Sequence, residues 1–170
     1  MQFSSNEKIS CCGLYIVKDI MKNLEDSERN IFHLEFHYIN FENSSESLNF
    51  WKVRGFKIES LHFAKCVLTE DVVKAIVVNC PNLKRLSVEN QGPDGERFQK
   101  IFSSACLNEL VRTQIRRETL NCLELKLYTN EMISDSSLRA LFLIFPNVRR
   151  LLFDSSPEIF TKNISRMYID

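Results

Sequence analysis

Glycine and proline are scarce in this 170-residue chain, which has four of each. Glycine-rich loops that cradle phosphate groups are therefore not expected. No apolar run reaches the roughly 18 residues that a membrane span needs, and the first eight residues are polar, unlike a secretory signal. An excess of charge is also lacking, because 22 Lys and Arg balance 22 Asp and Glu. This balance argues against nucleic acid and membranes as partners.

Motifs that carry catalysis or metal binding are missing too. The chain contains no GxSxG, no GxxxxGK[ST] and no HExxH sequence. Its six cysteines form no CxxC pair and have no nearby histidine at zinc-ligand spacing. We therefore expect a non-enzyme with no catalytic residue, no cofactor and no metal. We interpret Cys11 and Cys12, beside Gly13, as the start of a helix with ordinary thiols.

What remains is an ordinary globular composition, with 44% apolar and 26% charged residues over the length of one domain. Cysteines without a secretory signal are typical of a reducing compartment. We expect most of them to be small buried side chains, and the protein to be cytoplasmic or nuclear.

The informative feature of the sequence is an internal repeat. The string Pro81-Asn82-Leu83-Lys84-Arg85-Leu86 returns as Pro146-Asn147-Val148-Arg149-Arg150-Leu151. A wider pattern, apolar-x-x-apolar-x-apolar, occurs five times and starts at Ile31, Ile58, Leu83, Leu120 and Val148. These starts are 27, 25, 37 and 28 residues apart, close to the unit length of a leucine-rich repeat apart from one longer unit. The pattern predicts one short strand in each unit.

The segments between these strands have helical periodicity. The second unit predicts a helix that Thr69 caps, that Pro81 ends and that carries apolar residues Val72, Val73, Ile76, Val77 and Cys80. The fourth predicts a helix after Ile133-Ser134-Asp135 with apolar residues Leu138, Leu141, Phe142 and Phe145. The first unit predicts a short helix that Ser44 or Ser45 caps and that carries Leu48 and Trp51. The third unit opens with Gly92-Pro93-Asp94-Gly95 and continues as one kinked helix or two short ones ending near Arg117.

One stretch resembles a known repeat class. Ile58-x-x-Leu61-x-Phe63-x-x-Cys66-x-Leu68-Thr69-Glu70-x-x-Val73-x-x-Ile76, then Cys80-x-x-Leu83-x-x-Leu86, is similar to the cysteine-containing leucine-rich repeat of F-box/LRR proteins. Ile133-Ser134-Asp135-x-x-Leu138-x-x-Leu141 resembles part of the same repeat. The resemblance implies an α/β leucine-rich-repeat solenoid of about five strand–helix units with a curved parallel sheet. It also implies a substrate receptor of an SCF-type ubiquitin ligase.

The chain departs from that family near its start. An F-box begins near Leu-Pro, and here the first thirty residues contain no proline. Residues 14–25 instead predict an amphipathic helix with Ile16, Val17, Ile20, Met21 and Leu24 on one face. This helix is either a cap over the first repeat or the remnant of a trimmed F-box. We expect an N-terminal helix or cap over residues 1–29, repeats over 30–156, and a C-terminal cap or tail over 157–170.

The residues that alternate with the apolar strand positions should face the open, concave side of the sheet. We expect them to contact a partner, and the candidates are His33, Glu35, His37, His62, Arg85, Glu89, Glu124, Lys126, Arg150 and Asp154. Replacing Glu124 in particular should change stability by less than about 0.5 kcal/mol.

All three histidines lie on this predicted face. A shared metal is disfavoured, because His33 and His37 are about 13 Å apart along one strand and a metal ion holds its nitrogen ligands at about 2 Å. A pH-sensitive or partner-contacting patch and ordinary solvated histidines remain as interpretations.

The sequence thus predicts a non-catalytic protein–protein interaction module whose partner binds the concave face. The family resemblance implies ubiquitin-ligase components or a ligase substrate as partners, and neither nucleic acid nor a membrane is expected. The alternative is a small α/β enzyme or nucleotide-binding domain that uses the loop between Gly92 and Gly95.

Overall fold

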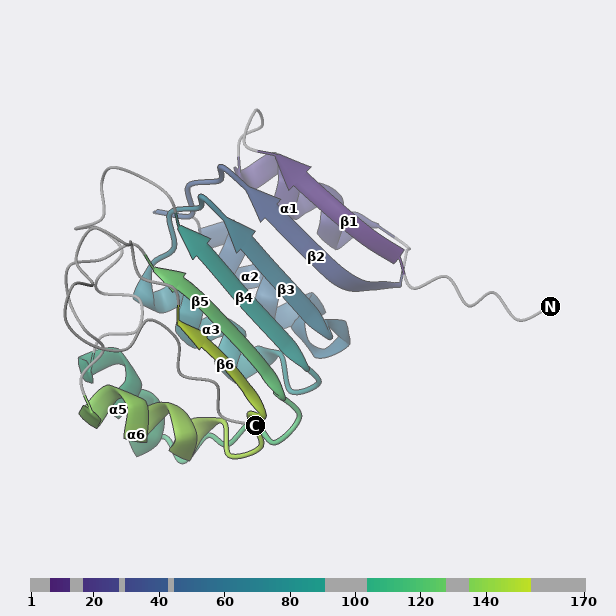
Figure 1. The fold of residues 1–170 in the computed structure, drawn as a ribbon. Helices are drawn as coiled ribbons and strands as arrows, with labels where there is room; N and C mark the ends of the chain where they lie inside the picture. Colours follow the sequence, from purple (N-terminus) through teal and green to yellow (C-terminus); the bar gives the residue numbers. More distant parts are fainter. Residues whose placement is uncertain are drawn as a thin grey trace, which may run out of the picture.

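Strands alternate with helices along the chain (Figure 1). The computed structural model describes residues 7–12, 17–27, 30–42, 45–90, 104–127 and 135–153. The strands are β1 (Glu7–Cys12), β2 (Ile31–His37), β3 (Ser60–Ala64), β4 (Arg85–Asn90), β5 (Cys122–Leu127) and β6 (Arg150–Phe153). The helices are α1 (Val17–Asp26), α2 (Ser45–Arg54), α3 (Glu70–Asn79), α5 (Ser104–Arg112) and α6 (Asp135–Ile144), with a 3-10 turn η1 (Gly55–Lys57) after α2. The protein therefore belongs to the α/β class, as the sequence predicts.

The six strands form one sheet in which spatial order equals chain order and each neighbouring pair is parallel. The register places the central leucine of each predicted repeat beside that of the next. These residues are Leu34, Leu61, Leu86, Leu123 and Leu151. The alignment of the five predicted strands is confirmed.

Among the residues that the structure describes, helices cover one face of the sheet, and no helix or strand lies on the other. Crossovers between parallel strands are nearly always right-handed, and when they step in one direction they place the helices on one side. Figure 1 shows α1, α2 and α3 behind the sheet and α5 and α6 beside β6. Each helix contacts the next along the row, from α1 to α2, α3, α5 and α6. We call the side without helices the open face.

The core lies between the sheet and the helix row. The strand residues that point toward the helices are buried, among them Leu34, Phe36, Leu61 and Phe63, whereas their neighbours along β2 and β3 are partly exposed. Phe36 stacks on Phe63 with ring centroids 5.4 Å apart, and Trp51 meets Phe36 edge-on at 6.2 Å. Such aromatic side chains each bury about 150–250 Å², so this group stabilises the join between β2, β3 and α2.

Helix α3 follows the prediction closely. The Thr69 side-chain oxygen accepts a hydrogen bond from the Val72 backbone N–H at 3.3 Å, which satisfies one of the donors left open at the helix start. The helix ends at Asn79, two residues before Pro81. Its predicted apolar residues are all buried.

Helices α5 and α6 differ from the prediction in detail. Phe142 was expected in the core but is 38% exposed, while Ile144 is fully buried. The buried stripe of α6 therefore centres on Leu141, Ile144 and Phe145 and leaves Phe142 at its margin. Helix α5 ends at Arg112 rather than near Arg117. The predicted loop at residues 92–95 lies outside the described residues.

A sixth strand was not predicted. Interpreting Cys11 and Cys12 as a helix start was wrong, because both belong to β1, which pairs with β2. The strand shows the expected alternation: Ile9 and Cys11 pack partly against the core, whereas Lys8, Ser10 and Cys12 are exposed. Helix α1, close to the helix expected over residues 14–25, follows this strand and buries Ile20, Met21 and Leu24.

Backbone hydrogen bonds repeat where the strands begin. The N–H of Glu59 donates to the Phe32 carbonyl, that of Lys84 to Glu59, that of Asn121 to Lys84 and that of Arg149 to Asn121. These bonds extend the parallel ladder by the same step in each successive unit. The units that repeat in the sequence therefore also repeat the same backbone hydrogen bond at the start of each strand.

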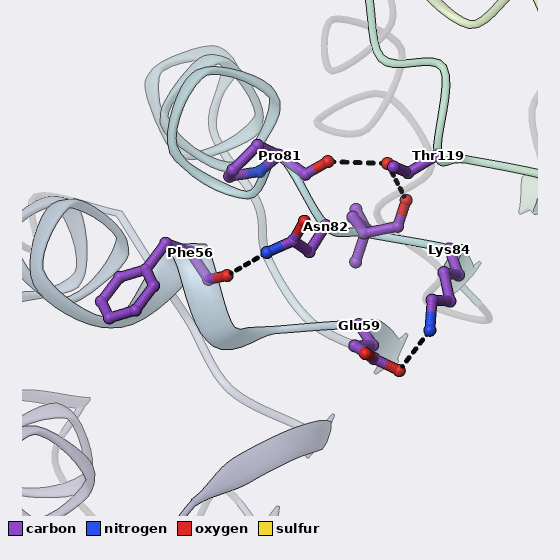
Figure 2. A network of polar contacts seen from close by, with 7 residues as sticks. Phe56, Glu59, Pro81, Asn82, Lys84 and Thr119 are labelled. Carbon is purple, nitrogen blue, oxygen red and sulfur yellow. Dashed lines mark hydrogen bonds and ion pairs between the residues drawn. The ribbon is translucent and has the colours of Figure 1, made fainter.

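Side-chain hydrogen bonds also form near the ends at which the strands begin (Figure 2). The Asn82 amide donates to the Phe56 carbonyl at 2.7 Å, and Asn147, at the matching position of the second Pro-Asn string, donates to the Glu118 carbonyl at 2.9 Å. The Thr119 hydroxyl lies 2.7 Å from the Pro81 carbonyl oxygen and 2.9 Å from that of Leu83. The contacts to Phe56, Glu118 and Pro81 each satisfy a carbonyl of the preceding unit and so join two units, whereas the contact to Leu83 lies within one unit.

Two arginines join neighbouring helices. Arg54, the last residue of α2, donates to the carbonyl oxygens of Glu25 and Ser27 at the end of α1. Arg117, after α5, donates to the carbonyls of Val77 and Val78 near the end of α3. The last turn of a helix leaves carbonyl groups without partners and carries partial negative charge, so a guanidinium group there is stabilising.

Candidate functional site

Three rows of residues run across the strands at the positions that alternate with the core residues, and Leu152 and Lys126 are placed in these rows through their backbones alone. The first row contains Lys8, His33, Ser60, Arg85, Cys122 and Arg150, which lie in register from β1 to β6. The second contains Ser10, Glu35, His62, Ser87, Glu124 and Leu152. The third contains Cys12, His37, Ala64, Glu89 and Lys126. The candidate residues are thus brought together on adjacent strands, as parallel pairing requires.

Glu35 is the centre of a polar cluster on β1, β2 and β3. Its carboxylate lies 2.8 Å from the Lys8 ammonium group and 3.9 Å from His37 Nε2. His62 is its register partner, and the imidazole centroids of His37 and His62 are 5.8 Å apart. The hydrogen bond from Lys8, with the nearby charges of Lys8 and the two histidines, lowers the pKa of Glu35 although partial burial opposes this. The cluster holds one carboxylate among three basic groups.

Glu124 is the centre of a second cluster, on β4 and β5. Its side chain accepts a hydrogen bond from Arg85 Nη2 at 3.0 Å and a weaker one from the Cys122 thiol at 3.5 Å. The residue is only 8% exposed. Its burial and its bond to Arg85 make a stability change larger than the 0.5 kcal/mol expected from the sequence the better prediction. Burial opposes ionisation of this carboxyl, but the charge and hydrogen bond of Arg85 outweigh it and lower the pKa of Glu124. Arg85 itself remains largely exposed.

Tyr38 and Lys65 directly follow β2 and β3, and both are exposed. Both residues have left-handed backbones, with φ of 59° and 55°, a conformation that costs side-chain-bearing residues about 1–2 kcal/mol. Their N–H groups donate to the Ala64 and Glu89 carbonyls, the last step of the parallel ladder. Lys65 Nζ lies 3.0 Å from the Tyr38 hydroxyl and 5.0 Å from the ring centroid. Sequence reasoning missed this pair, because neither residue type signals a left-handed backbone.

The remaining candidates vary in how far the structure describes them. Glu89 is partly exposed at the third row, and Arg150 is exposed at the start of β6. Lys126 is placed in β5 beside Glu89 through its backbone. Asp154 lies outside the described residues.

Three thiols are buried in the core. Burial raises the pKa of Cys66 to about 11, of Cys80 to about 12 and of Cys106 to about 11. These thiols are therefore protonated at neutral pH and poor nucleophiles. Cys66 lies with its sulfur 3.2 Å from the Phe36 carbonyl oxygen, which ties β2 to the segment after β3. Within the described ranges, no group of three or more His, Cys, Asp or Glu side chains is placed to hold a metal ion.

Comparison of the chain with models of protein families, with curated proteins and with solved structures found no match. Among the helices that the structure describes, none has the length and apolar character needed to cross a bilayer.

Proposed function

We propose that the chain is a leucine-rich-repeat solenoid that acts as a non-catalytic interaction module and binds a protein partner on the open face of its sheet. The observation that carries this proposal is the one-sided construction of the sheet. Helices and core cover one face, while the other presents rows of charged, histidine and small polar side chains over six parallel strands.

The solenoid part of the proposal rests on repetition between units. Spatial strand order equals chain order, and the same strand-entry hydrogen bond recurs from Glu59 to Arg149. Each unit contacts mainly its neighbours, as stacked repeats do. In such a stack helices are wider than strands, so the open face would be the concave one.

The strand order also favours binding over nucleotide chemistry. Doubly wound enzymes bind their cofactors at a crevice where the strand order reverses. The six described strands contain no such reversal. The enzyme alternative would therefore depend on the loop at residues 92–95, which the structure does not describe.

The ligase role is a narrower form of the proposal and rests on the resemblance to F-box/LRR proteins. In that form the open face binds a protein that is to be ubiquitylated. A pull-down with the SCF adaptor protein tests it. Retention of the adaptor supports ligase coupling, and its absence leaves a free-standing interaction module.

The partner-binding role is tested by site-specific photo-cross-linking in cells followed by mass spectrometry. A cross-linking amino acid at His33 would probe the open face, and the same amino acid at Lys52, exposed on α2, would serve as the matched control on the helix side. We expect one recurrent protein captured from position 33 and not from position 52. Capture from position 52 alone would contradict the proposal.

A further inference from the structure

We propose that the first row of the open face binds an acidic segment of the partner, with a partner carboxylate held between Arg85 and Arg150. This inference rests on the proposed function and specifies the chemistry of the partner. Its basis is the sign and spacing of the charges that the strand register brings together.

The first row contains no carboxylate on any of the six strands. In spatial order it reads Lys8, His33, Ser60, Arg85, Cys122 and Arg150. Neighbouring strands lie about 4.8 Å apart, so the row is about 24 Å wide. An extended segment of roughly seven residues would cross it.

Short side chains separate the long basic ones. Cys122 lies between Arg85 and Arg150, whose backbones are about 9.6 Å apart on the flanking strands. A thiol rises less above a sheet than a guanidinium group does, so the two arginines flank a lower position. Glu124 Oε1 borders this position, 3.5 Å from the Cys122 thiol and 3.0 Å from Arg85 Nη2, so a partner carboxylate would accept from the remaining Arg85 donors and from Arg150. Guanidinium groups match carboxylate geometry well.

The carboxylates of the second row do not cancel this preference. Glu35 is held by Lys8 at 2.8 Å and Glu124 by Arg85 at 3.0 Å, and Glu124 is only 8% exposed. Two of the three permanent cations thus neutralise the two acids. The exposed Arg150 leaves a net positive charge on the two rows.

The charges fit an acidic peptide better than a nucleic acid. Binding to a phosphate backbone depends on many cations and single strands also need aromatic stacking. The first row supplies three permanent cations, its side chains include no aromatic ring besides the imidazole of His33, and the whole chain has no net charge. A short run of Asp or Glu side chains matches that number of cations.

The test is fluorescence anisotropy with the full chain and a labelled peptide of five Glu-Ser repeats, at neutral pH and low salt. A peptide of five Gln-Ser repeats is the neutral control. We expect the Glu peptide to bind more tightly, and Arg150→Gln to weaken it about fivefold or more. Arg139→Gln makes the same charge change on an exposed residue of α6 and should change binding less than twofold.

Arg85 needs a paired variant, because removing it alone leaves the buried Glu124 carboxylate without its cation. Arg85→Gln combined with Glu124→Gln keeps the net charge and should still weaken the Glu peptide. Equal binding of the two peptides, no binding of the Glu peptide, or equal effects of the Arg150 and Arg139 variants would overturn the inference. So would tighter binding of a ten-nucleotide uridine RNA that Arg150→Gln weakens. Capture of a partner from position 33 does not depend on any of these peptide-binding results. The failure of this inference and the failure of the interaction role are therefore distinguishable.

Discussion

The side-chain amide of Asn82 donates a 2.7 Å hydrogen bond to the carbonyl oxygen of Phe56, 26 residues earlier in the chain. Asn147 makes the matching bond to Glu118 in a later unit. The Pro-Asn string that repeats in the sequence therefore marks where an asparagine side chain joins two units. It explains why the same residue follows proline in both copies.

Removing this bond should weaken the join between two units. We expect Asn82→Ala to lower the free energy of unfolding by about 0.5–1.5 kcal/mol, because the Phe56 carbonyl loses its donor. Asn82→Asp keeps the size but removes the amide donor, so it should cost a similar amount. Urea denaturation measures both. If Asn82→Ala lowers the free energy of unfolding but Asn82→Asp leaves it unchanged, the amide donor is not responsible for the loss.

Gly55 should not accept a side chain. A Cβ at this position would lie 2.6 Å from the Asn79 carbonyl oxygen and 3.0 Å from the Cys80 sulfur. The first contact is with backbone, which cannot move aside without shifting the end of α3. We expect Gly55→Ala to destabilise the protein by about 1–3 kcal/mol, measured by thermal unfolding. Val53→Ala, at an exposed position of the preceding helix, is the control, and equal losses in the two variants would contradict the close approach.

Glu124 should make stability depend on pH. Its folded-state pKa is lowered by Arg85, so its contribution is present above the unfolded value of about 4.3 and is lost as pH falls through the folded value. We expect Glu124→Gln to cost about 1–2 kcal/mol at pH 7 and much less at pH 3. Urea denaturation of both proteins at the two pH values measures this. A cost that is the same at both would mean that the ionised carboxylate is not responsible.

The thiols should differ sharply in reactivity. Cys12 is exposed, whereas Cys66, Cys80 and Cys106 are buried and have raised pKa values. We expect a thiol reagent at pH 8 to modify Cys12 first and the three buried residues only after unfolding. Peptide mapping by mass spectrometry assigns the sites. Fast modification of Cys80 in the native protein would contradict the packing around α3.

The sequence predicts the parts of this fold that depend on periodic apolar residues. Leu34, Leu61 and Leu86 stand at matching places in their repeats, so their register follows from the spacing. Strand β1 was missed because its inward residues, Ile9 and Cys11, give too short and too weakly apolar an alternation to separate from a helix start. Phe142 was misplaced because helical spacing alone fixes the buried stripe only to within one neighbouring position.

The candidate site was predicted in outline and not in its contacts. Alternation placed Glu35, Glu124 and the histidines on one face. The sequence could not show that Lys8, on the unpredicted strand, holds Glu35, or that Glu124 is nearly buried beneath Arg85. Both depend on side-chain packing across strands far apart in sequence, which local patterns do not encode.

Along each strand, side chains point alternately to the core and to the open face. Two neighbouring residues of β2 test this alternation most directly. Leu34 is 1% exposed on the core side, and His33 is partly exposed on the open face. The account predicts that Leu34→Ala lowers the free energy of unfolding by about 2–5 kcal/mol and that His33→Ala changes it by less than about 0.5 kcal/mol, both measured by urea denaturation. Equal losses at the two positions would contradict a sheet with one buried face and one face left for a partner.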